Sequence, residues 1–257
     1  MKASLKRRDY REYTWSGAEL VLTVIQVFGA VFFLALFFYR SLWAVIPLSP
    51  VGAVYFRILK RKKIENCRRQ LVSEFKECVL SVATALRAGY AVENAFLESR
   101  NDMRMLYGEH SLIFQELEVI RRGLVINITL EELLKDLAER SACQEIRQFA
   151  EVFVIAKRNG GNLSEIIKDS SGIISRRIDT AQEIQTLLSG REMEQTVMKA
   201  MPFGIPVYIS ITYPGYFDSL YHNWQGVVIM SVCLLVYLAA YGLSDKIIRQ
   251  IAKELVA

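Results

Sequence analysis

Two acidic pairs have the residue type that general acid–base catalysis uses: Glu131 with Glu132, and Glu116 with Glu118. Neither pair is accompanied by a histidine or a nucleophile at a spacing that would complete a catalytic site. We interpret both pairs as solvated helix faces and as partners of helix dipoles.

The remaining residues with reactive side chains are two histidines and four cysteines: His110, His222, Cys67, Cys78, Cys143 and Cys233. The cysteines share no metal-ligand spacing, and we interpret them as small buried hydrophobes. The chain has no G-x-x-x-x-G-K-[ST], H-E-x-x-H or G-x-S-x-G motif. We therefore expect a protein that is not an enzyme, with no catalytic, cofactor-binding or metal-binding residues and no cofactor.

Four uncharged apolar segments dominate the two ends of the chain: residues 20–39, 42–56, 200–217 and 224–242. The first has about the 20 residues that a helix needs to cross a bilayer, and it is too long for a signal peptide. The second is shorter and is interrupted by Pro47 and Pro50, so by length alone it could be re-entrant. The centres of all four segments lack ionisable residues, which argues against an ion pathway.

Basic residues indicate how these segments are oriented. They cluster in residues 2–11, 57–69 and 246–253, whereas the two short connections between apolar segments carry almost none. The positive-inside rule then predicts four spans in the cytoplasmic membrane, with both termini and the central domain in the cytoplasm. The net charge of +5 does not indicate nucleic-acid binding, because residues 70–196 hold 15 Lys and Arg against 20 Asp and Glu. The basic clusters instead favour contact with anionic lipids.

The part of the chain between Pro50 and Pro202 contains no proline, which permits long uninterrupted helices. Apolar residues recur there at helical spacing, for example at Leu71, Phe75 and Cys78. We therefore predict an all-α fold: an integral membrane protein in which a cytoplasmic antiparallel helical bundle lies between two transmembrane hairpins. The predicted boundaries are residues 1–56 for the N-terminal tail and hairpin, 57–196 for the bundle, 197–243 for the C-terminal hairpin and 244–257 for a cytoplasmic tail.

Three helix junctions combine a basic residue in the last turn with a following glycine, which favours a left-handed C-cap. The junctions contain Arg87, Gly89 and Glu93; Arg122, Gly123, Thr129 and Glu132; and Arg158, Gly160, Gly161, Asn162 and Glu165. Thr129 with Glu132 and Asn162 with Glu165 have capping-box spacing, and Ser141 with Gln144 marks one further helix start. Helix termination alone explains these residues. The alternative is that Arg87, Gly89, Glu93, Arg158, Gly160, Gly161 and Asn162 also contact a partner.

Two of these junctions resemble the F domain of type II secretion systems. Residues 80–95 (LSVATALRAGYAVENA) are similar to its first half, and residues 160–167 (GGNLSEII) to its second. One F domain flanked by two hydrophobic hairpins resembles the TadB/TadC branch, which serves tight-adherence (Flp) pili. Two-domain relatives carry an acidic Gly-Glu before the second motif, where this chain has Ala156, Lys157 and Arg158.

The resemblance implies a non-enzymatic assembly platform in the inner membrane, which couples a cytoplasmic secretion ATPase to pilin extraction and export. The implied partners are that ATPase, a second platform protein of the same family, and prepilin or pilin subunits, in a homo- or hetero-oligomer. A transporter permease or a sensor subunit with a cytoplasmic helical domain is the alternative that the sequence leaves open.

Accessibility labelling of single cysteines introduced at Ser41 and Asn223 tests the predicted topology. We expect both to be labelled from the exterior, because both lie in the weakly charged connections. Cytoplasmic labelling at Ser41 would mean that residues 42–56 do not span the membrane.

Overall fold

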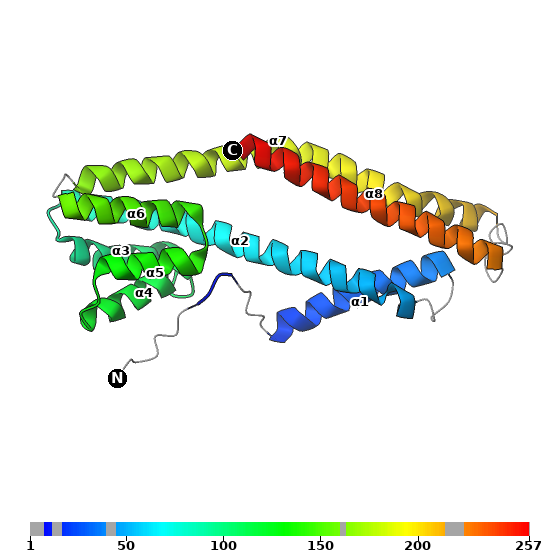
Figure 1. The fold of residues 1–257 in the computed structure, drawn as a ribbon, viewed down its shortest axis with the longest axis horizontal. Coiled ribbons are helices and arrows are strands. Elements are labelled where there is room, and N and C mark those ends of the chain that lie inside the picture. Colours follow the sequence, from blue (N-terminus) through cyan, green and yellow to red (C-terminus); the bar gives the residue numbers. More distant parts are fainter. Residues whose placement is uncertain (1–7, 12–16, 40–44, 160–162, 214–223, 257) are drawn as a thin grey trace. The chain divides into compact units, whose positions relative to one another are not determined.

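The computed structural model describes residues 8–11, 17–39, 45–159, 163–213 and 224–256 (Figure 1). The described residues contain eight α-helices and no strand, so the predicted all-α class is confirmed. The helices are α1 (Gly17–Tyr39), α2 (Val45–Arg87), α3 (Val92–Tyr107), α4 (Leu112–Val125), α5 (Leu130–Ser141), α6 (Gln144–Asn159), α7 (Leu163–Thr212) and α8 (Trp224–Val256).

Contacts divide the chain into two compact units. The first unit comprises Leu59–Ile178 and the N-terminal residues up to Trp15, and the second comprises Ser16–Ile58 and Asp179–Ala257. Helices α2 and α7 therefore contribute residues to both units. The four-part division expected from the sequence stays a prediction.

The core of the first unit is built from the apolar stripes that the sequence predicts. Phe75 of α2 and Phe149 of α6 meet edge to face with ring centroids 5.2 Å apart, and Phe96 of α3 and Phe153 of α6 do so at 6.0 Å. All four rings are buried. Edge-to-face pairs add to the free energy of burial because the positive ring edge meets the negative face. The predicted stripes of α4 and α5 are buried as well, at Ile113, Leu117 and Ile120 and at Leu130, Leu133, Leu134 and Leu137.

Two predicted helix ends are confirmed in detail. Arg87 is the last residue of α2, and Gly89 follows with a φ of +91°, a conformation that glycine adopts at no steric cost. Thr129 caps α5, and its hydroxyl oxygen accepts a hydrogen bond from the amide of Glu132.

The predictions for Gly123 and Ser141 are wrong. Gly123 lies inside α4, which continues to Val125, and Asn127 rather than Gly123 takes the positive φ in the turn that follows. A Cβ at position 123 would lie 2.4 Å from Leu133 Cδ2, so this glycine permits close packing of α4 against α5. Ser141 ends α5 instead of starting α6, and its hydroxyl donates back to the carbonyl of Ala138.

The second unit has its own apolar cluster, centred on Phe203 of α7. The Phe203 ring lies 5.0 Å from that of Phe37 in α1 and 5.1 Å from that of Tyr237 in α8. Helices α1 and α2 also approach closely, because a Cβ added at Gly52 would lie only 3.0 Å from Val31 Cγ2. Small residues permit this kind of contact between apolar helices. The predicted continuation of α7 into the third apolar segment is confirmed, and Pro202 and Pro206 lie within that helix.

Two described helices are long and apolar enough to span a membrane: Gly17–Tyr39 and Trp224–Ser244. Only 17% and 11% of their most apolar stretches are buried, respectively. Apolar helices in the core of a soluble protein are buried, so this exposure favours membrane association. The other two predicted spans, residues 42–56 and 200–217, lie partly outside the described residues and stay predictions, as do the cytoplasmic termini.

The close packing at Gly123 predicts that Gly123→Ala lowers the free energy of unfolding of the first unit by about 1–3 kcal/mol, because buried Leu133 has no room to move. Thermal unfolding of the full chain in detergent, followed by circular dichroism, measures the change. Gly172→Ala in α7 is the matched control, since no atom lies within 4 Å of its added Cβ. It should leave stability unchanged or raise it by up to about 1 kcal/mol. Equal losses for the two variants would contradict the packing argument.

Candidate functional site

Lys157 brings three helix ends together at one end of the first unit. Its Nζ lies 2.9 Å from Glu93 Oε1 and 3.1 Å from Glu131 Oε1. Lys157 belongs to the last turn of α6, whereas Glu93 and Glu131 belong to the first turns of α3 and α5. The first turns of α3 and α5 and the last turn of α6 therefore meet at the same end of the bundle, which we call the junction end.

Helix dipoles favour this arrangement of charges. Carboxylates stand at the positive N-terminal ends of α3 and α5, and an ammonium stands at the negative C-terminal end of α6. The hydrogen bond from Lys157 lowers the pKa of Glu93. Burial alone would lower the pKa of Lys157, but hydrogen bonds to Glu93 and Glu131 outweigh it and the pKa is raised. Glu93 and Lys157 are therefore both charged at neutral pH.

Four of the seven residues predicted as contact or junction residues lie in described parts of the chain. Glu93 is joined to Lys157, Arg87 ends α2, Gly89 forms the turn before α3, and Arg158 is exposed in the last turn of α6. Gly160, Gly161 and Asn162 lie outside the described residues. The structure thus places Glu93 beside the helix turn that carries Arg158, and the contact role of all seven stays a prediction.

Large apolar side chains are exposed in two turns of the junction end. Tyr90 is 50% exposed in the turn before α3, and Val125 and Ile126 are 71% and 53% exposed in the turn before α5. Exposed apolar residues beside fixed charges are typical of surfaces that bind another protein.

Sequence reasoning missed Lys157 and the pairing of Glu131. Our interpretation of Glu131 as a solvated residue is wrong, because its side chain is only 28% exposed and binds Lys157. Its Oε2 is buried and has no hydrogen-bond partner among the described residues. The signal in the sequence was a basic residue in the last turn of α6, where it meets the negative end of the helix dipole.

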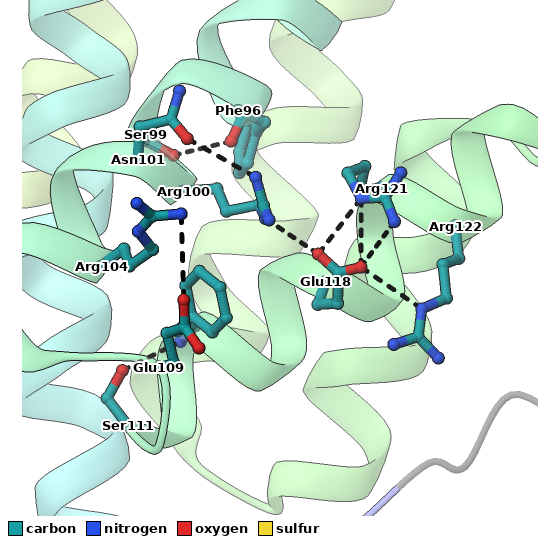
Figure 2. A network of polar contacts seen from close by, with 11 residues as sticks. Phe96, Ser99, Arg100, Asn101, Arg104, Glu109, Ser111, Glu118, Arg121 and Arg122 are labelled. Atoms are coloured by element: carbon teal, nitrogen blue, oxygen red, sulfur yellow. Dashed lines mark hydrogen bonds and ion pairs between the residues drawn. The ribbon is translucent and has the colours of Figure 1, made fainter.

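The interpretation of Glu116 and Glu118 as solvated is also wrong. Glu118 of α4 accepts hydrogen bonds from Arg100 of α3 at 2.8 Å, from Arg121 at 2.6 Å and from Arg122 at 3.4 Å (Figure 2). The hydrogen bonds from Arg121 lower the pKa of Glu118 to about 2, and the charge of Arg100 adds to the effect. The pair of Arg100 with Glu118 joins α3 to α4.

Glu116 is buried, and it forms a two-pronged ion pair with Arg140 of α5. Arg140 Nη1 lies 3.0 Å from Glu116 Oε1, and Nη2 lies 2.7 Å from Oε2. Arg140 also donates to Asp136, through Nε at 2.8 Å. Burial alone would lower the pKa of Arg140, but the bonds to Glu116 and Asp136 outweigh it and the pKa is raised. Paired in this way, buried Glu116 and partly buried Arg140 hold α4 against α5.

The junction end combines paired charges with exposed apolar side chains. Its charged groups are committed to one another, and no group of three or more His, Cys, Asp or Glu residues that could hold a metal ion occurs among the described residues. The surface of the junction end is a charged centre bordered by exposed apolar side chains, and the ends of packed helices hold both in position.

In comparisons with known proteins, no family model, no curated protein and no solved structure matches the chain.

The contacts of Lys157 with Glu93 and Glu131, which we call the Lys157 bridge, predict that Lys157→Gln is less stable than the wild type and that the difference depends on pH. At pH 7 the free energy of unfolding should fall by about 1 kcal/mol, because two carboxylates lose the cation between them. The pKa of Glu93 lies below its ordinary value of 4.5 in the folded protein, so its contribution is present above pH 4.5 and is lost as the pH falls through the lowered pKa. The difference between the wild type and the variant should therefore shrink in acid.

Denaturant unfolding of the full chain at a series of pH values measures this difference. Lys168→Gln is the matched control, since Lys168 is an exposed lysine of α7 that makes no ion pair with a described residue. A loss in Lys157→Gln that is the same at pH 7 and at pH 3, or is no larger than in the control, would contradict the prediction.

Proposed function

We propose that the protein is a membrane assembly-platform protein of a pilus or type II secretion-like machine, which couples a cytoplasmic secretion ATPase to pilin extraction and export. The observation that carries the proposal is the junction end, where Lys157 ties together the ends of α3, α5 and α6. Residues 80–95, one of the two stretches that resemble the F domain, contribute the turn before α3 to this same end.

In the proposed topology, both transmembrane hairpins cross the inner membrane, and both termini and the helical bundle lie in the cytoplasm. Two apolar helices and three basic clusters support this arrangement. The platform acts with a second platform protein of the same family or with further copies of itself, and it contacts pilin subunits within the membrane.

The proposed mechanism uses no chemistry of the chain's own. The sequence lacks the phosphate-binding loop motif, so the energy comes from the ATPase. Force applied at the junction end reaches the apolar segments through α7, which starts beside that end and runs without a break from Leu163 to Thr212. A helix of 50 residues is about 75 Å long at ~1.5 Å per residue, enough to connect a cytoplasmic surface to a membrane.

Arg158→Glu tests the contact with the ATPase. Arg158 is exposed beside Lys157, so reversing its charge should weaken binding of the purified secretion ATPase at least tenfold and leave helix content and melting temperature unchanged. Biolayer interferometry with the full-length platform in nanodiscs measures the affinity, and circular dichroism measures the folding.

Arg147→Glu is the matched control, because Arg147 is exposed on the same helix near its opposite end. Loss of melting temperature together with binding in Arg158→Glu would show that Arg158 is only a helix-capping residue. Absence of ATPase binding by the wild type, or ATP hydrolysis by the platform alone, would overturn the proposed function.

A further inference from the structure

Residues 8–11, which we call the N-terminal strap, lie against α2 and α5 and are held by hydrogen bonds that each use at least one backbone atom. The amide of Tyr10 donates to the carbonyl of Arg140 at 3.0 Å, and the carbonyl of Tyr10 accepts from Arg68 Nε at 3.1 Å. Arg11 Nη2 donates to the carbonyl of Glu139 at 3.0 Å. The strap is thus held by partners that are distant in the sequence.

Tyr10 anchors the strap. Its side chain is only 3% exposed, and its hydroxyl donates to Glu116 Oε1 at 2.9 Å. The same carboxylate is held on its other side by Arg140, which also donates to the carbonyl of Arg8 at 2.8 Å. Burial raises the pKa of Tyr10 well above its ordinary value, and Glu116 adds to the effect. The hydroxyl therefore stays protonated and remains a donor at neutral pH. Tyr10 thus contacts both members of the ion pair, Glu116 through its hydroxyl and Arg140 through its amide.

The strap is attached much less extensively than the helices that it covers. Tyr10 is its single buried residue, and Asp9 and Arg11 are exposed. By contrast, α4 and α5 bury eight and six residues, respectively. A segment with one buried side chain and a few hydrogen bonds opens at a lower free-energy cost than a helix packed into the core.

We propose that the N-terminal strap is a releasable latch: Tyr10 closes it over the Glu116–Arg140 pair, and it opens in a local step while the helices of the first unit stay folded. Opening withdraws the Tyr10 hydroxyl from Glu116 and the carbonyl of Arg8 from Arg140, so each member of the ion pair loses one hydrogen-bond partner. The latch does not depend on the proposed function.

Hydrogen exchange of the full chain in detergent, followed by mass spectrometry, tests the latch. In the wild type, the amide of Tyr10 should exchange more slowly than in an unstructured peptide and faster than the amides of α4 and α5. Tyr10→Phe removes one hydrogen bond to a charged carboxylate and keeps the ring. It should speed exchange of the strap by about 10- to 100-fold and leave α4 and α5 unchanged.

Tyr107→Phe is the matched control, since it removes the hydroxyl of a tyrosine that is 42% exposed at the end of α3. It should not change exchange of the strap. Arg11→Ala is a second variant, at an exposed position, and it removes one hydrogen bond to a carbonyl. It should speed exchange of the strap by about 2- to 10-fold, so the test remains possible if Tyr10→Phe fails to fold.

Three results would overturn the proposal. Equal exchange rates in the strap and in α4 of the wild type would show that the strap opens only when the unit unfolds. Equal acceleration of both in Tyr10→Phe would show that Tyr10 is a core residue and not a latch. Exchange of the wild-type strap at the rate of a free peptide would show that it is not closed in solution. Trypsin cleavage after Arg8 and Arg11 gives an independent measure of the same opening.

Discussion

The buried ion pair of Glu116 with Arg140 is the interaction on which the first unit depends most. It joins α4 to α5, and through Arg140 and Tyr10 it also holds the N-terminal strap. Removing one partner of such a pair costs about 3–5 kcal/mol, because the other charge is left buried without compensation. A full set of hydrogen bonds makes this burial possible: Glu116 accepts from Arg140 and Tyr10, and Arg140 donates further to Asp136 and to the carbonyl of Arg8.

The first unit has a second charged centre at the junction end, and the two centres differ in what surrounds them. The Glu116–Arg140 pair is enclosed, so its contribution is to packing and to closure of the strap. The Lys157 bridge is partly exposed and is bordered by the apolar side chains of Tyr90, Val125 and Ile126. It can therefore fix the positions of these helix ends and remain accessible to another molecule. The platform function that we propose would use both properties: a core that keeps its shape under load and an outer surface that can bind.

The helical pattern was predictable because it depends on local rules. Apolar residues three and four apart must lie on one face of a helix, and Phe75, Leu117 and Leu134 are buried as their spacing requires. The confirmed helix ends at Gly89 and Thr129 follow from backbone preferences that act within a few residues. The candidate site was predictable only in part. Glu93 was found through its helix end, whereas its partner Lys157 lies 64 residues further along the chain.

The sequence by itself determined the all-α class, the two apolar helices and the helix ends at Gly89 and Thr129, since composition, periodicity and local backbone preferences specify these element by element. Only the tertiary structure decided which charges are buried and which are paired. Glu116 and Glu118 look alike in the sequence, yet Glu116 is enclosed by α5 and the strap, and Glu118 is ringed by arginines of α3 and α4. Gly123 likewise has the sequence context of a helix cap but serves as a contact point for Leu133. The physical reason is the same in each case: the environment of a side chain is set by neighbours distant in sequence, and no local pattern encodes their approach.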